Sequence, residues 1–85
     1  GRRLAVLYVV NGRYAEAMPL LDAHLQEQPA DQDALFAAIV GQYEQFRVGQ
    51  VLSNINRAKV KRYGAAYAGP QKNLVAKYLE AMGVR

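Results

Sequence analysis

Apolar residues recur along this chain at three- and four-residue spacings, the period of a helix with one buried face. No segment alternates for long enough to indicate a β-strand; residues 7–10 are apolar and partly β-branched but too few. The pattern therefore predicts an all-α fold of about five helices. The predicted buried positions are Leu4, Leu7 and Tyr8; Tyr14, Ala17, Met18, Leu21 and Leu25; Leu35, Phe36, Ile39, Val40 and Tyr43; Leu52, Ile55, Val60, Tyr63 and Tyr67; and Leu74, Val75, Tyr78, Leu79 and Met82.

Residues that favour helix ends lie between these segments. Asp31 or Asp33 is a suitable N-cap for the third helix, and Ser53 for the fourth, because their side chains accept hydrogen bonds from unpaired helix amides. Gly69-Pro70 is expected to end the fourth helix and to start the fifth, with proline at the first helical position. Gly83 is expected to stop the fifth helix.

Two residues are unusual inside the predicted helices. Pro19 lacks a backbone donor and is expected to kink or restart the second helix near Met18. Gly64 costs the fourth helix about 1 kcal/mol relative to alanine, so it is expected to mark a close crossing with another helix.

The segment from Leu4 to Pro29 reads LAVLYVVNGRYAEAMPLLDAHLQEQP. Asn11-Gly12 supplies a tight turn between two helices, because glycine takes left-handed backbone angles without a Cβ clash. Residues 12–17 match the pattern GxYxEA, and the segment resembles one unit of a tetratricopeptide (TPR) repeat. The residues at the spacings of that family are Leu4, Ala5, Tyr8, Ala17, Leu21 and Pro29. Departures from its pattern are Gly1 for an aromatic residue, Ala5 for glycine, Leu21 for phenylalanine or tyrosine, and His24 for alanine.

A second, degenerate repeat is expected to follow. In a register of about 34 residues a glycine turn should come soon after Tyr43, but residues 45–51 do not supply it. With roughly seven extra residues in that connection, Ala58 takes the alanine position and Pro70 that of the closing proline. The resemblance implies TPR-like antiparallel helical hairpins, an α-solenoid fragment whose last helix is a cap. Residues 1–85 are expected to form one domain, the C-terminal fragment of a larger, bacterial-type repeat protein.

The same resemblance implies a non-catalytic protein-interaction or scaffold module. In such repeats the first helix of each hairpin lines the concave, partner-binding side. The exposed positions expected on that side are Arg3, Asn11, Gln32, Ala38 and Gln42. The outer face of the first helix, which a preceding repeat covers in an array, is expected to favour self-association when uncovered.

Charge divides the chain into two unequal halves. Residues 1–44 carry three basic and six acidic side chains, a net charge of −3, whereas residues 45–85 carry eight basic and one acidic, a net charge of +7. Arg57 and Lys61 lie one helical turn apart. The basic residues expected to contact a partner are Arg47, Arg57, Lys59, Lys61, Arg62, Lys72 and Lys77.

This basic face has three interpretations. It docks an acidic protein or peptide, it binds the phosphates of a nucleic acid, or it is a solvated surface on a capping end that binds nothing. The solvated surface is the commonest case for such faces, and an acidic protein is favoured over nucleic acid. Tyr63, Tyr67 and Tyr78 interleave with the cations, but their spacing places them on the apolar stripes rather than on a base-stacking surface.

Catalytic chemistry has little support in this sequence. His24 is the only histidine, and among nearby carboxylates only Glu27 lies at a helical spacing that reaches its imidazole. Ser53 is the only serine, threonine is absent, and a helix cap accounts for Ser53 better than a nucleophile does. No catalytic, cofactor or metal site is predicted, since phosphate loops, dinucleotide fingerprints and calcium loops are missing.

Cysteine and long apolar runs are also absent from the sequence. Without cysteine no disulfide or thiolate metal site is available, and no segment has the apolar length of a membrane span. These features leave the compartment undetermined, with cytoplasm and periplasm both open.

Overall fold

Five α-helices follow one another in the computed structural model, which describes residues 2–84. They are α1 (Arg2–Val10), α2 (Tyr14–Glu27), α3 (Gln32–Gly49), α4 (Asn54–Ala66) and α5 (Lys72–Ala81). The predicted all-α class is therefore confirmed, and residues 2–84 contain no strand. Among these residues, no helix combines the length and the apolar character that crossing a membrane requires.

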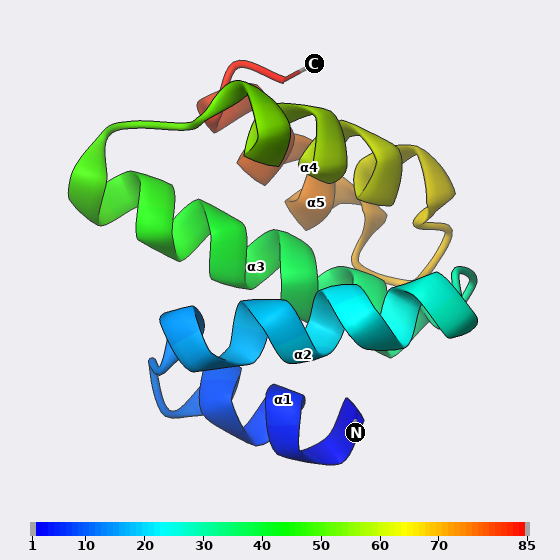
Figure 1. Ribbon diagram of the computed structural model, residues 1–85. Coiled ribbons are helices and arrows are strands. Elements are labelled where there is room, and N and C mark those ends of the chain that lie inside the picture. The colour runs from blue at the N-terminus through cyan, green and yellow to red at the C-terminus, as the bar shows by residue number, and fades with distance from the viewer. Residues whose placement is uncertain (1, 85) are drawn as a thin grey trace.

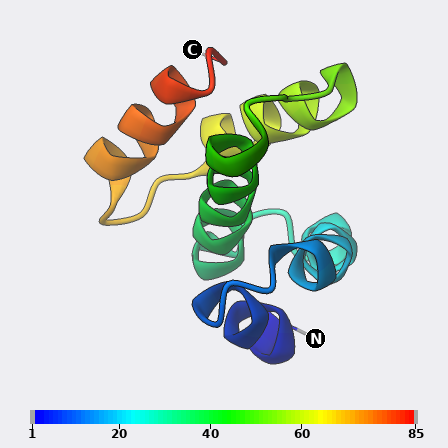
Figure 2. The ribbon, with the colours of Figure 1, turned by 90° about the vertical axis from the view of Figure 1, so that its left-hand side faces the viewer.

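The central element of the fold is α3. The α1–α2 hairpin lies against one side of it, while α4 and α5 lie against the other (Figures 1 and 2). Helix α1 contacts only α2 and α3, so α1 and α5 lie at opposite ends of the molecule (Figure 1). Because α3 is covered from both sides, Ala38 and Gln42 are buried, with exposed fractions of 0% and 4%. The expectation that these two residues face a partner was wrong.

The predicted helix starts of α3 and α4 are confirmed. Asp31 caps α3, its side chain accepting a hydrogen bond from the Ala34 amide at 3.3 Å. Ser53 caps α4 in the same way, accepting from the Asn56 amide at 3.1 Å. The Asp31 carboxylate and the Ser53 hydroxyl thus each satisfy one of the helix amides that have no partner within the helix.

Two glycines end helices through left-handed backbone angles. Gly12 has φ of +75° in the turn between α1 and α2, and Gly83 has φ of +70° after α5. Beyond Gly83, the Val84 amide donates to the Leu79 carbonyl at 3.0 Å, which closes the last turn. Both glycine stops were predicted from the sequence.

The expected restart of α2 near Met18 does not occur. Helix α2 runs from Tyr14 to Glu27 as one element with Pro19 inside it. The proline removes one backbone donor, but its own side chain is exposed, and residues on both sides of it, such as Ala17 and Leu21, are buried in the same core. Burial of the helix face therefore offsets the missing hydrogen bond.

The connections around α4 also differ from expectation. Helix α3 extends to Gly49, so most of the extra residues after Tyr43 are helical rather than part of a loop. Helix α4 ends at Ala66, before Gly69-Pro70, and Pro70 lies in a turn two residues before α5 starts at Lys72. Tyr67 explains the early stop, because its extended backbone turns the ring into the core, where its hydroxyl accepts from the Gln71 amide at 3.0 Å.

The core contains most of the predicted stripes. Its buried apolar side chains are Ala5, Ala17, Met18, Leu21, Leu25, Ala34, Leu35, Ala37, Ala38, Ile39, Val60, Tyr63, Tyr67, Val75 and Met82. Ile55 was wrongly placed among them, since it is 78% exposed near the start of α4, and so were Leu4 and Leu7 of α1, at 46% and 54% exposure. Ala58 is exposed as well, whereas Ala17, its counterpart in the shifted register, is fully buried. The close crossing expected at Gly64 is confirmed by its contact with Leu79 of α5.

Candidate functional site

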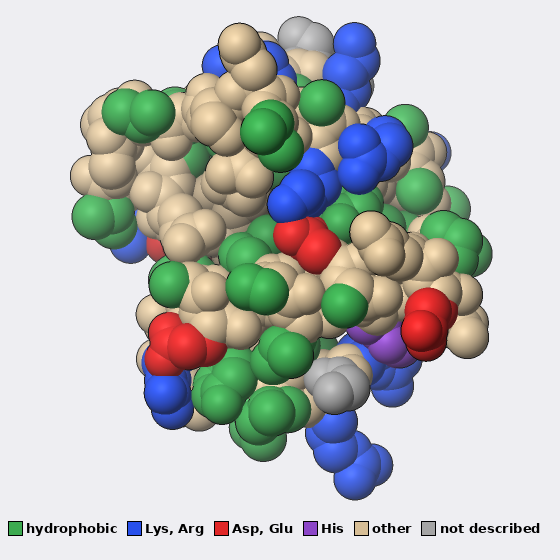
Figure 3. Space-filling view, viewed as in Figure 1, with side chains coloured by type: hydrophobic (Ala, Val, Ile, Leu, Met, Phe, Trp, Pro, Cys, Tyr) green, Lys and Arg blue, Asp and Glu red, His purple; other side chains and the backbone are tan. Residues whose placement is uncertain are grey.

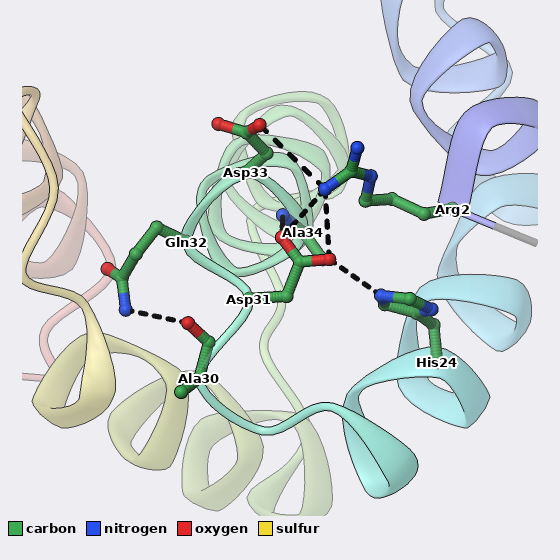
Figure 4. Close-up of polar contacts among 7 residues, drawn as sticks. All are labelled: Arg2, His24, Ala30, Asp31, Gln32, Asp33 and Ala34. Carbon is green, nitrogen blue, oxygen red and sulfur yellow. Dashed lines mark hydrogen bonds and ion pairs between the residues drawn. The ribbon is translucent and has the colours of Figure 1, made fainter.

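A polar cluster joins α1, α2 and α3 around the carboxylate of Asp31 (Figure 4). His24 Nε2 lies 2.7 Å from Asp31 Oδ2, and Arg2 Nη1 donates to both carboxylate oxygens at 3.1 and 3.2 Å. Burial raises the pKa of the Asp31 carboxyl, but the hydrogen bonds from His24, the Ala34 amide and Arg2 outweigh it, so the net pKa is lowered. The cluster holds the first turns of α1 and α3 to α2.

The carboxylate beside His24 comes from outside its own helix. Helical spacing left only Glu27 within reach of the imidazole, but the loop between α2 and α3 turns back and brings Asp31 to it. An aspartate that orients a histidine also occurs in catalytic triads. The only serine, Ser53, is used as the cap of α4, and the chain has no cysteine or threonine to serve as the nucleophile. Within residues 2–84 no three metal-ligating side chains come together.

Three of the seven predicted contact cations bind groups of this chain. Lys59 Nζ lies 2.5 Å from Asp22 Oδ2, and Arg57 donates to the Gly83 carbonyl at 2.8 Å. Arg47 pairs with Glu44 at 2.9 Å on the last turns of α3, apart from the others. The structure therefore does not bring the seven cations together as one face. Arg57 and Lys61 do lie one turn apart, but Arg57 is directed to the end of α5.

The other four predicted cations are exposed. Lys61 and Arg62 lie on α4, and Lys72 and Lys77 lie on α5. On α4 they are accompanied by exposed apolar side chains, so that one outward surface combines charge with aliphatic area. This surface, called the outer face of α4 below, consists of Ile55, Ala58, Lys61, Arg62 and Ala65. In Figure 3 basic side chains gather over α4 and meet an acidic side chain on its border with α2.

A groove of 480 Å³ lies between α2 and α4 and is called the α2–α4 groove. Its lining residues are Asp22, Leu25, Gln26, Pro29, Leu35, Lys59, Arg62, Tyr63 and Ala66. Asp22 accepts from the hydroxyl of Tyr63 at 2.7 Å as well as from Lys59. Burial and this hydrogen bond raise the pKa of Tyr63, so its hydroxyl stays a donor.

A second groove, of 660 Å³, lies between α1 and α3 and is called the α1–α3 groove. Its walls are aliphatic or aromatic apart from three charged residues at the rim. The lining residues are Arg2, Arg3, Val6, Leu7, Val9, Val10, Asp33, Phe36, Ala37 and Val40. Leu7 and Val10 are 54% and 75% exposed, which is unusual for large apolar side chains grouped around one depression. The helical stripes of the sequence did not reveal this groove, because they assigned Leu7 to the core.

The remaining positions expected on the partner side have separate surroundings. Arg3 lines the α1–α3 groove, and Asn11 is exposed in the turn after α1. Gln32 instead ties α3 to the end of α4, because its Oε1 accepts from the Ala68 amide at 2.6 Å.

The tyrosines that interleave with the cations are held by the fold, as predicted. Tyr63 and Tyr67 are buried, at 8% and 7% exposure. Tyr78 is half-buried and stacks on Tyr43 with ring centroids 4.3 Å apart. The faces of these three aromatic rings are therefore covered by other side chains of the protein.

Comparison of the chain with protein-family models, with curated proteins and with solved structures gives no match. The likeness to a TPR unit therefore rests on the residues of the segment from Leu4 to Pro29 alone.

Proposed function

We propose that this chain is a non-catalytic protein-interaction module of the helical-repeat type. Its main contact surface is the α1–α3 groove, which holds the apolar face of an amphipathic helix from a partner protein. The observation that carries this proposal is the exposure of Leu7 and Val10 on the wall of an apolar groove of 660 Å³. A partner that removes this exposed apolar area from water would gain binding free energy from its burial.

The dimensions of the α1–α3 groove support a helical occupant. Residues 33–40 of α3 line it over a length of about 10 Å, at roughly 1.5 Å per residue. Two turns of a partner helix span the same length and present three or four apolar anchors at helical spacing. The groove floor, formed in part by Phe36 and Val40, offers no hydrogen-bonding side chain, so the occupant's buried face is expected to be aliphatic or aromatic.

The basic side of α4 and α5 is a second contact surface in this proposal, for acidic segments of a protein. Lys61, Arg62, Lys72 and Lys77 are its cations, because the other three expected cations bind groups of the chain itself. Nucleic acid is the less favoured ligand, since base stacking needs open aromatic faces and the three nearby tyrosines are packed. Phosphate binding would also fall steeply with salt, whereas capture of an apolar helix would not.

The proposed function is tested with a phage-displayed library of helix-forming peptides selected on the whole chain. Selected peptides are expected to carry apolar residues at i, i+3 or i+4, and i+7, and to shift amide resonances of α1 and α3. Val10→Glu should weaken their binding about tenfold or more, because it places a charge in the apolar contact.

Val48→Glu is the matched control, since Val48 is 79% exposed, close to the 75% of Val10, but lies at the end of α3 outside this groove. Equal weakening by both substitutions, or resonance shifts outside α1 and α3, would contradict the assignment of the groove. A library that yields no binder would instead favour a capping end without a partner of its own.

A further inference from the structure

We propose that the α2–α4 groove binds a short acidic segment of a partner protein in which a carboxylate lies next to an aliphatic side chain. This inference rests on the second contact surface of the proposed function and deepens it, because both use Arg62 of α4 to bind an acidic segment; it does not depend on the α1–α3 groove, which lies on other helices. It assigns Arg62 the carboxylate and the apolar floor the aliphatic side chain.

The groove exists because α2 and α4 face each other without packing together. Each packs on α3, yet the two helices make no close backbone contact with one another over their described lengths. Side chains bridge the gap at one place, where Lys59 and Tyr63 of α4 both contact Asp22 of α2. Beyond that bridge the gap stays open, and its volume of 480 Å³ is within the range of about 300–1,000 Å³ typical of ligand pockets.

The bottom of the groove is apolar. Leu25 of α2 and Leu35 of α3 close it, at 4% and 1% exposure. Pro29 and Ala66, both exposed, stand on the two sides near the open end. An aliphatic side chain inserted between them would remove the exposed apolar area of Pro29 and Ala66 from water.

The charge of the groove favours an acidic occupant. Its one carboxylate, Asp22, is already satisfied, because Lys59 binds one oxygen and Tyr63 the other. Arg62 adds a second cation, and among residues 2–84 it forms no ion pair; its guanidinium lies 5.9 Å from the centroid of the Tyr63 ring. Lys61 is exposed beside it on α4. An arginine bound to a carboxylate can form two parallel hydrogen bonds, which fixes the orientation of the ligand.

The test uses three fluorescein-labelled peptides of equal length that share a central pair of leucines. Glutamate, glutamine or lysine occupies the flanking positions, which gives an acidic, a neutral and a basic probe. Fluorescence anisotropy on the whole chain is expected to rank the acidic probe first. Arg62→Gln should weaken the acidic probe about tenfold, in line with the loss of one charged hydrogen-bonding pair, and should leave the neutral probe nearly unchanged.

Two further variants separate the groove from general electrostatics. Arg47→Gln removes the same charge from an exposed position on the last turns of α3, outside both grooves, and should change the affinity for the acidic probe less than about twofold. Ala66→Leu fills the open end of the groove from an exposed position and should weaken the acidic and neutral probes alike. Val10→Glu, in the α1–α3 groove, should have no effect on the acidic probe, so failure of one proposal is distinguishable from failure of the other.

Several results would overturn the inference. They are equal affinity for the acidic and neutral probes, equal weakening by Arg62→Gln and Arg47→Gln, no effect of Ala66→Leu, and no binding of any probe. Displacement of the acidic probe by a single-stranded oligonucleotide, with a steep salt dependence, would assign these cations to nucleic acid instead. Amide resonance shifts confined to α1 would likewise exclude the α2–α4 groove.

Discussion

Gly64 of α4 lies so close to Leu79 of α5 that a Cβ at position 64 would stand 2.6 Å from Leu79 Cδ1. The absence of a side chain at Gly64 therefore sets how near α5 approaches α4. Both helices hold the exposed cations of the basic side, so this contact fixes the relative positions of the charged residues on α4 and α5.

The effect of Gly64→Ala on the free energy of unfolding is expected to depend on the side chain at position 79. Gly64→Ala gains about 1 kcal/mol of helix propensity, but in the native background it forces Leu79 to shift, at a cost of roughly 1–3 kcal/mol. The single variant should therefore be neutral to about 2 kcal/mol less stable. In a Leu79→Ala background the clash is gone, and Gly64→Ala should stabilise by about 1 kcal/mol. Urea denaturation measures all four proteins; the same effect in both backgrounds would show that Leu79 does not limit the approach.

Stability is expected to fall in acid through Asp31. The pKa of this carboxyl is lowered in the folded protein, so the folded state favours the ionised form more than the unfolded chain does. The contribution of Asp31 to stability is therefore present above the ordinary aspartate pKa of about 3.9 and is lost as pH falls through the folded pKa. The free energy of unfolding should therefore decrease between about pH 5 and about pH 3.

The variant Asp31→Asn isolates this contribution. Asparagine still caps α3, but it loses the ion pair with Arg2, so the variant should be about 1–2 kcal/mol less stable at neutral pH and less sensitive to acid. Asp33→Asn is the control, because the Asp33 side chain is 83% exposed and lies 3.9 Å from Arg2. If both variants show the acid dependence of the native protein, the Asp31 cluster does not set it.

Self-association through α1 is a further expectation. Leu4, Leu7 and Val10 are 46%, 54% and 75% exposed, and α1 contacts only α2 and α3. At high concentration a second copy can cover this apolar area in place of a partner helix. Sedimentation velocity across a concentration series should show a weak, reversible association that Leu7→Glu abolishes and that Ile55→Glu, on α4 and 78% exposed, does not. A strict monomer at every concentration would argue against it.

The sequence predicted where the helices lie better than it predicted which of their residues other elements cover and where each helix ends. Periodicity shows which face of a segment is apolar but not what covers it, so Ile55 was assigned to the core although no element lies over the start of its stripe. The length of α3 was missed because the exposed residues of its last turn, Arg47, Val48 and Gly49, continue no apolar stripe; the helix ends only where Gln50 adopts a left-handed φ of 57°. Local patterns carry no signal for that stop.

The candidate site depended on contacts between residues far apart in the chain. Lys59 reaches Asp22, 37 residues away, and Arg57 reaches Gly83, 26 residues away. Nothing in the local sequence distinguishes these cations from Arg62, which lies on the same helix and keeps its guanidinium exposed. The two grooves likewise arise from how helices are spaced on α3, which depends on side chains from several elements at once.

Replacement of Pro19 is expected to stabilise the protein, because α2 passes through this residue without a break. Proline inside a helix costs up to about 3 kcal/mol relative to alanine, and at this position it lacks the amide that would donate to the carbonyl of Ala15. Its side chain is exposed, so Pro19→Ala leaves no cavity in the core. The variant should gain roughly 1–3 kcal/mol and a correspondingly higher Tm.

Ala23→Pro supplies the contrast, since Ala23 is also exposed on α2 but lies one turn further along. A second proline there removes another helical hydrogen bond and clashes with the preceding turn, so it should cost about 3 kcal/mol or more. Thermal unfolding followed by circular dichroism distinguishes the cases. If Pro19→Ala lowers the Tm, the proline must restrict the unfolded chain more than it weakens the helix, since fewer unfolded conformations also favour the native state. A rise in Tm would show instead that the buried face of α2, and not its backbone hydrogen bonding alone, holds the helix together through Pro19.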